Sequence, residues 1–93
     1  MGSRIYINMK KEKFVKKTSL DKLKAGDSCV VKEIKILDST LFRKIIDMGI
    51  VSGTSIKVVK SIPFDGPIII ELFGYELCIR KNISKNILVE VMA

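Results

Sequence analysis

Three acidic side chains are the residues whose type and spacing first suggest chemistry. Asp65, Glu71 and Glu76 could approach one another across one predicted hairpin, and carboxylate oxygens are ligands that divalent cations prefer. The sequence contains no histidine, which removes the commonest general base and metal ligand. No serine, cysteine or lysine stands in a recognisable nucleophile setting. We therefore interpret the three carboxylates as solvated charges on strand faces, and predict no catalytic residue, no metal ligand and no cofactor.

Two cysteines are the next candidates for chemistry. Cys29 and Cys78 both lie inside apolar, strand-like runs, where free cysteines are usually buried. Two distant cysteines without a histidine make a poor zinc or iron site. A disulfide is also unexpected, because we expect a cytoplasmic protein and cytoplasmic thiols are kept reduced. We predict two buried, reduced thiols.

A pair of glycines, Gly49 and Gly53, joins an apolar helical pattern to an apolar strand pattern within DMGIVSGTSIKVV. A phosphate-binding loop requires the opposite order, strand before helix, and a Lys-Ser or Lys-Thr pair after the glycines. Here the incoming helix C-terminus presents carbonyl groups, which repel phosphate. We therefore predict a structural joint, with Gly49 left-handed just after the helix and Ile50 packed back onto Ile45. Gly53 is predicted to supply the positive φ of the type II turn that follows.

The helix before this joint is the most strongly patterned element. The segment DSTLFRKIIDMG begins at Asp38 or Ser39, either of which can cap a helix N-terminus. Leu41, Ile45 and Met48 then recur at i, i+4 and i+7 along one face. The pattern predicts an amphipathic helix that ends at Met48.

The other elements are short apolar strands separated by turns that contain glycine or proline. The patterns predict a helical turn over residues 20–25 and strands over residues 29–37, 54–62, 67–73, 75–81 and 86–92. The first strand does not separate its apolar residues by face, so we expect a bulge within it. Gly74 marks the tight turn of one hairpin and residues 63–67 the longer turn of another. Five strands, one short helix and no parallel crossover predict a mainly β fold, a small closed or partly closed antiparallel barrel.

Basic charge is concentrated at the N-terminus. Six basic residues and one acidic residue lie in residues 1–17, which therefore carry most of the net charge of +7. We predict that residues 1–17 are a basic, flexible arm and that residues 18–93 are one domain. No strand interleaves basic residues with the exposed aromatics that stack on bases, so no specific nucleic acid is expected. No apolar run approaches the ~18 residues that span a bilayer, and we expect a cytoplasmic location.

The sequence resembles the FeoA family, the small cytoplasmic companions of the bacterial ferrous-iron transporter FeoB. The resemblance covers about residues 18–91 and rests on SLDKLKAGDSCVVKEI, FRKIIDMGIVSGTSIKVV, PFDGPIIIELFGYELCIRK and ISKNILVEV. In this family the helix ends in Met-Gly-hydrophobic-x-Pro-Gly, and here Ser52 replaces the proline. The family's Pro-x-Gly-Asp-Pro hairpin is also present, with Asp65 and Gly66 in the inverted order before Pro67.

The resemblance implies an SH3-like barrel that is not an enzyme. It implies a regulatory protein-interaction module that binds the cytosolic part of FeoB, a membrane protein with a GTP-binding domain, and modulates Fe(II) uptake. Proximity to the membrane would come only through that partner. We expect contacts at the helix end and the longer hairpin, where apolar residues are held on stiff turns: Met48, Gly49, Ile50, Phe64, Asp65, Gly66 and Pro67. The alternative that Met48 and Ile50 are simply core residues stays open.

Two functional alternatives and one question of oligomeric state also stay open. The same small barrel resembles the C-terminal domain of metal-dependent repressors, so the chain could be a stand-alone relative that acts in transcription or nucleic-acid binding. Direct binding of ferrous iron is the second, although the lack of histidine argues against it. The question of oligomeric state is whether a homodimer forms, through pairing of short strands such as residues 86–92 at the barrel seam.

Overall fold

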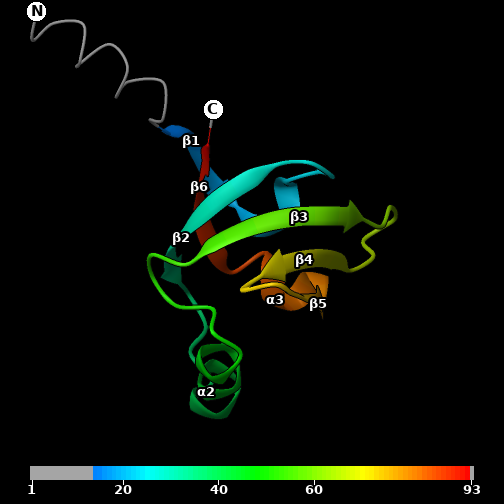
Figure 1. Ribbon diagram of the computed structural model, residues 1–93. Helices are drawn as coiled ribbons and strands as arrows, with labels where there is room; N and C mark the ends of the chain where they lie inside the picture. The colour runs from blue at the N-terminus through cyan, green and yellow to red at the C-terminus, as the bar shows by residue number, and fades with distance from the viewer. Residues whose placement is uncertain (1–13, 93) are drawn as a thin grey trace, which may run out of the picture.

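A single antiparallel sheet of six strands dominates the structure, a computed structural model that describes residues 14–92 (Figure 1). The strands follow one another across the sheet in the order β1-β6-β2-β3-β4-β5. In chain order the elements are β1 (Phe14–Ser19), the 3₁₀ turn η1 (Leu20–Lys22), β2 (Ser28–Ile34), α2 (Ser39–Asp47), β3 (Ser55–Ser61), β4 (Ile68–Leu72), β5 (Tyr75–Ile79), α3 (Lys81–Ser84) and β6 (Ile87–Met92). The mainly β, antiparallel fold is confirmed, with six strands instead of about five.

The sheet curves strongly, so that β1 and β6 run across the direction of β3 (Figure 1). Strands β1 and β5 stand at its two edges, and in the part of the chain that the structure describes they do not pair with each other. The barrel is therefore only partly closed. Helix α2 lies beyond one end of the sheet, and neither it nor any other described helix is long and apolar enough to cross a membrane (Figure 1).

Strand β1 corrects the expected boundary of the N-terminal arm. It begins at Phe14 and pairs with β6, with Lys17 opposite Glu90 and Thr18 opposite Val89. Residues 14–17 therefore belong to the sheet and not to a flexible arm. Their charge suggested a solvated segment, but the open edge of β6 supplies backbone partners that no local pattern reveals. The rest of the expected arm, residues 1–13, lies outside the described residues.

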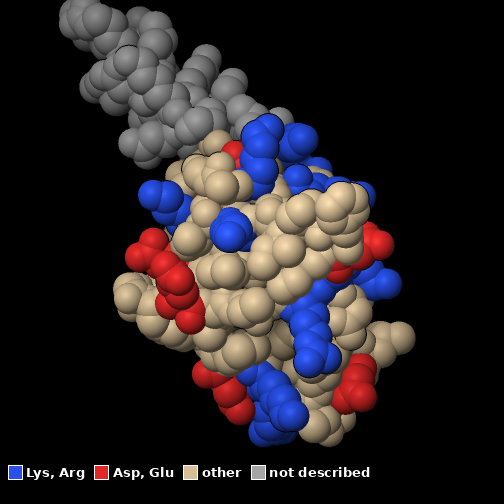
Figure 2. Space-filling view, turned by 90° about the vertical axis from the view of Figure 1, so that its right-hand side faces the viewer, with Lys and Arg blue, Asp and Glu red and all other residues tan. Residues whose placement is uncertain are grey.

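The face shown in Figure 2 carries both basic and acidic side chains, in separate groups with broad uncharged surface between them. Basic and acidic side chains also pair within the sheet, since the Glu90 carboxylate lies 3.9 Å from the Lys17 ammonium and 3.6 Å from that of Lys32. This face therefore does not present the continuous basic surface that tracks a nucleic-acid backbone.

Strand β2 contains the predicted bulge but ends earlier than expected. Its register against β6 shifts between Val31 and Glu33, which confirms the bulge. The strand ends at Ile34 instead of residue 37, and only Lys35 continues toward β6, through its N–H to the Asn86 carbonyl at 2.7 Å. Beyond that point the chain turns away toward α2.

Helix α3 (Lys81–Ser84) was not predicted, since a strand was expected over residues 75–81 and no element over the residues that follow. The strand ends at Ile79, and the N–H groups of Ile83 and Ser84 both donate to the Arg80 carbonyl, at 3.0 and 2.9 Å. Arg80 has no side-chain cap interaction with this helix. The start of α3 therefore carries no capping residue of the kind that predicts a helix N-terminus from the sequence.

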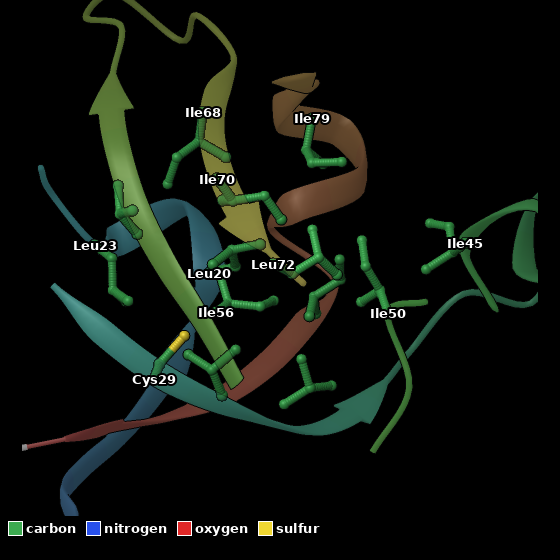
Figure 3. Packing of buried hydrophobic residues seen from close by; sticks show 14 residues of the cluster. Leu20, Leu23, Cys29, Ile45, Ile50, Ile56, Ile68, Ile70, Leu72 and Ile79 are labelled. Carbon is green, nitrogen blue, oxygen red and sulfur yellow. The ribbon is translucent and has the colours of Figure 1, made fainter. Parts of the chain in front are cut away.

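Most of the core lies inside the curved sheet, on alternate residues of its strands, and side chains of η1, α2 and the joint after α2 complete it (Figure 3). In β3, Ile56 and Val58 point inward while Ser55 and Lys57 are exposed, as the period of two requires. Fourteen buried apolar residues form one cluster: Leu20, Leu23, Cys29, Val31, Ile45, Ile50, Ile56, Val58, Ile68, Ile70, Leu72, Ile79, Ile87 and Val89. Burying each large aliphatic side chain contributes about 1.5–3 kcal/mol.

Candidate functional site

The end of α2 is fixed by the predicted glycine joint. The Gly49 N–H donates to the Ile46 carbonyl at 2.9 Å, and the Ile50 N–H donates to the Ile45 carbonyl at 3.2 Å. Gly49 has φ of 93°, the left-handed conformation predicted for it. These two bonds and this φ define a Schellman motif, which satisfies carbonyls that a helix C-terminus leaves unpaired. At the other end, the Asp38 carboxylate accepts from the Leu41 N–H at 2.9 Å, which confirms the predicted cap.

Thr54 braces this joint and was missed by the sequence analysis. Its hydroxyl donates to the Gly49 carbonyl at 2.9 Å and accepts from the Val51 N–H at 3.2 Å. Its own N–H donates to the Val51 carbonyl at 3.0 Å, closing the turn in which Gly53 has the predicted positive φ, 94°. Thr54 is only 6% exposed. The sequence signal that could have revealed it is a threonine directly after the glycine of the turn, where its hydroxyl can bond to nearby backbone groups.

The tip of the β4–β5 hairpin carries an exposed aromatic residue in an unusual backbone conformation. Phe73 and Gly74 form a two-residue loop between the paired residues Leu72 and Tyr75, and both loop residues have positive φ, 50° and 82°. This confirms the predicted tight turn at Gly74. Such turns favour Asn or Gly at the first position, because a left-handed backbone costs other residues about 1 kcal/mol or more. Phe73 nevertheless occupies it, with 75% of its surface exposed.

This hairpin tip lies against the end of α2. The Tyr75 hydroxyl donates to the Met48 carbonyl at 2.5 Å. A Cβ atom added to Gly49 would lie 3.0 Å from the Phe73 ring and 3.6 Å from the Tyr75 hydroxyl. Met48, Gly49, Phe73 and Tyr75 thus form one surface, which we call the helix-end surface. Phe73 and Tyr75 were not predicted to belong to it, because their approach to α2 depends on the tertiary fold.

Ile50 corrects part of the expected contact surface. It is 0% exposed and belongs to the core, so it offers nothing to a partner. The same Schellman geometry that was predicted explains this, since Ile50 folds back toward the helix that precedes it. Met48 is half-buried and packs against the core from outside.

The second expected contact region, residues 63–67, forms a compact turn. Phe64 is 98% exposed with φ of 60°, and Asp65 has φ of 61°. Gly66 donates its N–H to the Pro63 carbonyl at 3.2 Å. A Cβ atom there would come within 2.6 Å of the Ile62 side chain, so only glycine fits. Pro67 accepts from the Ile62 N–H at 3.1 Å, which closes the turn.

The two expected contact regions lie at opposite ends of β3. The helix-end surface adjoins the start of this strand at Ser55, and the 63–67 turn follows its end at Ser61. Seven extended residues separate the regions by about 20 Å. The structure therefore does not bring them together into one compact site.

Asp65 does not join Glu71 and Glu76 in a metal site. Glu71 and Glu76 stand opposite each other on β4 and β5, whereas the Asp65 carboxylate lies 3.3 Å from the Lys81 ammonium. Lys81 also lies 3.4 Å from the Asp21 carboxylate, and its hydrogen bond to Asp65, followed by that to Asp21, raises its pKa. Across residues 14–92, no three possible metal-ligating acidic or cysteine side chains come together.

The two cysteines differ in their surroundings. Cys29 is fully buried as predicted, and burial raises the pKa of its thiol to about 12, with the Asp27 carboxylate adding to the effect. A thiol with this pKa stays protonated and unreactive at neutral pH. Cys78 is exposed, so its predicted burial was wrong. It alternates with inward-facing residues on β5, an edge strand whose other face is open to solvent.

Comparison with known proteins gives the family. The family model described as the FeoA domain matches residues 18–91. A FeoA-like protein from Clostridium acetobutylicum has 40% sequence identity and a TM-score of 0.70, over 83% of this chain and 88% of that one. No curated protein matches the chain.

Two solved structures of lower identity show the fold alone. Stenotrophomonas maltophilia FeoA in complex with zinc, described as a prokaryotic SH3-domain protein, has 21% identity and a TM-score of 0.68, over 77% of this chain and 88% of that one. A manganese-dependent transcriptional repressor has 19% identity and a TM-score of 0.75, over 83% of this chain but only 42% of the repressor. The fold is SH3-like, as expected. With its match along nearly the whole described sheet, the chain belongs to the FeoA family, whose members are accessory proteins of ferrous-iron transport.

Proposed function

We propose that this chain is a non-enzymatic, cytoplasmic regulatory protein that binds the cytosolic part of a FeoB-type ferrous-iron transporter and modulates Fe(II) uptake. Membership of the FeoA family supports a role in ferrous-iron transport. The observation that carries the binding role is the helix-end surface, where an aromatic side chain is held exposed on a braced frame.

Phe73 is the natural anchor of this surface. Its left-handed backbone is unfavourable for a residue with a Cβ atom, and three-quarters of its surface remains in water. Strained residues of this kind cluster at binding sites, because the surrounding structure holds them ready for contact. Burial of an aromatic ring by a partner would remove a large apolar area from water. Aromatic anchors of this type contribute most of the binding energy at protein interfaces.

The frame around Phe73 is stiff, which lowers the entropy cost of binding. Gly49 is fixed by the Schellman bonds, Thr54 ties the following turn to it, and Tyr75 bonds the hairpin to the helix end. In this proposal the helix-end surface is the principal contact region. It keeps Met48 and Gly49 from the expected set, loses Ile50, and adds Phe73 and Tyr75. Phe64 and its neighbours Asp65, Gly66 and Pro67 remain a second contact region in this proposal, at the far end of β3.

Binding to the transporter can be tested with the purified cytosolic domain of FeoB from the same organism. The full chain is immobilised and the dissociation constant measured by interferometry. We expect Phe73→Ala to weaken binding at least about tenfold, in the range of interface anchors. Val59→Ala removes another exposed apolar side chain, on β3, and is expected to bind like the wild type. A folded chain that shows no association at about 100 µM domain would contradict the proposal.

A second candidate function is favoured by the fold shared with the manganese-dependent repressor, of which this chain spans less than half. According to this second candidate function, the barrel would act in transcription or nucleic-acid binding. Salt-dependent binding to duplex DNA that survives removal of residues 1–13 would support this function, since binding by a basic tail alone is nonspecific. The deletion has to stop before Phe14, because β1 begins there.

A further inference from the structure

Strand β5 leaves one edge of the sheet open. It pairs with β4 on one side, and no other described strand lies on its second side. The two-residue loop makes Leu72 and Tyr75 a hydrogen-bonded pair, so the odd-numbered residues of β5 direct their backbone groups toward β4. Glu76 and Cys78 consequently direct their N–H and C=O groups toward the open edge. Such an edge is a template for another strand.

The side chains along this edge carry charges without partners. Glu76, Cys78 and Arg80 are all exposed, on the face opposite Leu77 and Ile79. Among the described residues, neither Glu76 nor Arg80 forms an ion pair. Glu76 even stands opposite Glu71 of β4, and two like charges directly opposed across a ladder are unfavourable. A cation supplied from outside the open edge would relieve this repulsion.

The order of these residues makes β5 complementary to itself. If two copies of β5 pair antiparallel about a two-fold axis at Cys78, Glu76 of each copy lies opposite Arg80 of the other. On the inner face, Leu77 then stands opposite Ile79 of the second copy in the register, although Ile79 is already buried in the core of its own chain. We propose that two copies of this chain associate by pairing their β5 edges about Cys78, which extends the sheet across a two-fold axis.

Other registers do not have this complementarity. A shift that centres the pair on Glu76 or on Arg80 places like charges opposite each other. A shift centred on Leu77 sets Glu76 against Cys78, and one centred on Ile79 sets Arg80 against Cys78. Only the register centred on Cys78 matches both charges, and opposite charges directly across a ladder stabilise the pairing whereas like charges destabilise it.

The same geometry limits the strength of the dimer. Each strand has only five residues, and the Arg80 carbonyl already accepts two N–H groups of α3. The interface is therefore smaller than the standard size of stable complexes. We expect a reversible dimer with a dissociation constant above about 1 µM.

Sedimentation equilibrium of the full chain under reducing conditions tests the proposal. We expect Glu76→Arg and Arg80→Glu each to raise the dissociation constant at least about tenfold, because each sets like charges opposite one another twice in the dimer. The double variant, in which both charges are exchanged, should recover most of the wild-type affinity. Glu33→Arg makes the same change in net charge at an exposed position of β2 and should leave the dimer unchanged.

Cross-linking through Cys78 tests the position of the two-fold axis. A hydrogen-bonded pair across antiparallel strands has Cα atoms about 5.5 Å apart, within the range of a disulfide. With diamide as the oxidant, the two thiols give two protons and two electrons to its N=N bond, forming an S–S bond and a hydrazine. The covalent dimer should form several-fold faster in the wild type than in Glu76→Arg, and Cys29→Ser should not change the rate.

Three results would overturn the proposal. One is a chain that remains monomeric at about 1 mM. Another is a double variant, with both charges exchanged, that dimerises no more tightly than the two weakened single variants. The third is an equal cross-linking rate in wild type and charge variants, which would mean random collision of exposed thiols. Circular dichroism confirms that each variant is folded, and if one single variant unfolds, the other single variant decides the question.

Discussion

Gly49 and Gly53 share nearly the same left-handed backbone but have different surroundings. Their φ angles are 93° and 94°. A Cβ atom at Gly49 would lie 3.0 Å from the Phe73 ring, whereas one at Gly53 would meet no atom within 4 Å. The two residues therefore separate the cost of backbone strain from the cost of contact with the hairpin tip.

We expect Gly53→Ala to lower the free energy of unfolding by about 1 kcal/mol, the cost of a left-handed alanine. Gly49→Ala should cost more, about 1–2 kcal/mol, because its methyl group also displaces the Phe73 ring. Urea denaturation of both variants measures the difference. An unchanged midpoint for Gly49→Ala would contradict both the φ assignment and the contact.

At the scale of elements, α2 is attached to the sheet by few side chains. Ile45 is its only fully buried residue, while Phe42 is 39% exposed. Its attachment depends instead on its C-terminus, where the Schellman bonds and the Tyr75 hydroxyl engage the last carbonyls. We infer that the hairpin tip and the helix end behave as one unit.

Removal of one hydroxyl tests this coupling. Tyr75→Phe keeps the ring and deletes the bond to the Met48 carbonyl, so we expect a loss of about 0.5–1.5 kcal/mol in unfolding free energy. Amide hydrogen exchange in α2 should become faster, while exchange in β2 and β6 should follow only the global loss. Equal changes in α2 and in the sheet would mean that the bond does not couple the two elements.

The predictable elements are those whose signals are local. Asp38, the apolar stripe and Gly49 all lie within one short segment, so the helix and its end followed from the sequence. Strand β1 exists because the edge of β6 is open to it, and the exposure of Cys78 follows from the edge position of β5. Phe73 adopts a left-handed backbone in a turn that would suit asparagine. These features depend on distant segments, which periodicity and turn signals do not encode.

At the scale of the whole molecule, the SH3-like sheet separates two kinds of contact. The helix-end surface lies beside the start of β3, and the exposed groups of Glu76 and Cys78 follow the outer edge of β5. Because Tyr75 of the helix-end surface directly precedes Glu76 of the open edge, the surface for the transporter and the surface for a second copy adjoin. The Glu76 and Arg80 variants should change the dissociation constant of the dimer more than that of the complex with the transporter. Phe73 variants should change the dissociation constant of the complex with the transporter more than that of the dimer.

The most direct test of the central claim replaces Phe73 by asparagine. Phe73→Asn suits the left-handed turn position, so the protein should become more stable, by about 0.5–1 kcal/mol. The same change removes the aromatic anchor, so calorimetric titration with the cytosolic domain of the transporter should show binding at least about tenfold weaker. Opposite changes in stability and affinity are the predicted result. Unchanged affinity in a folded Phe73→Asn chain would contradict the account, because the exposed ring would then have no part in binding.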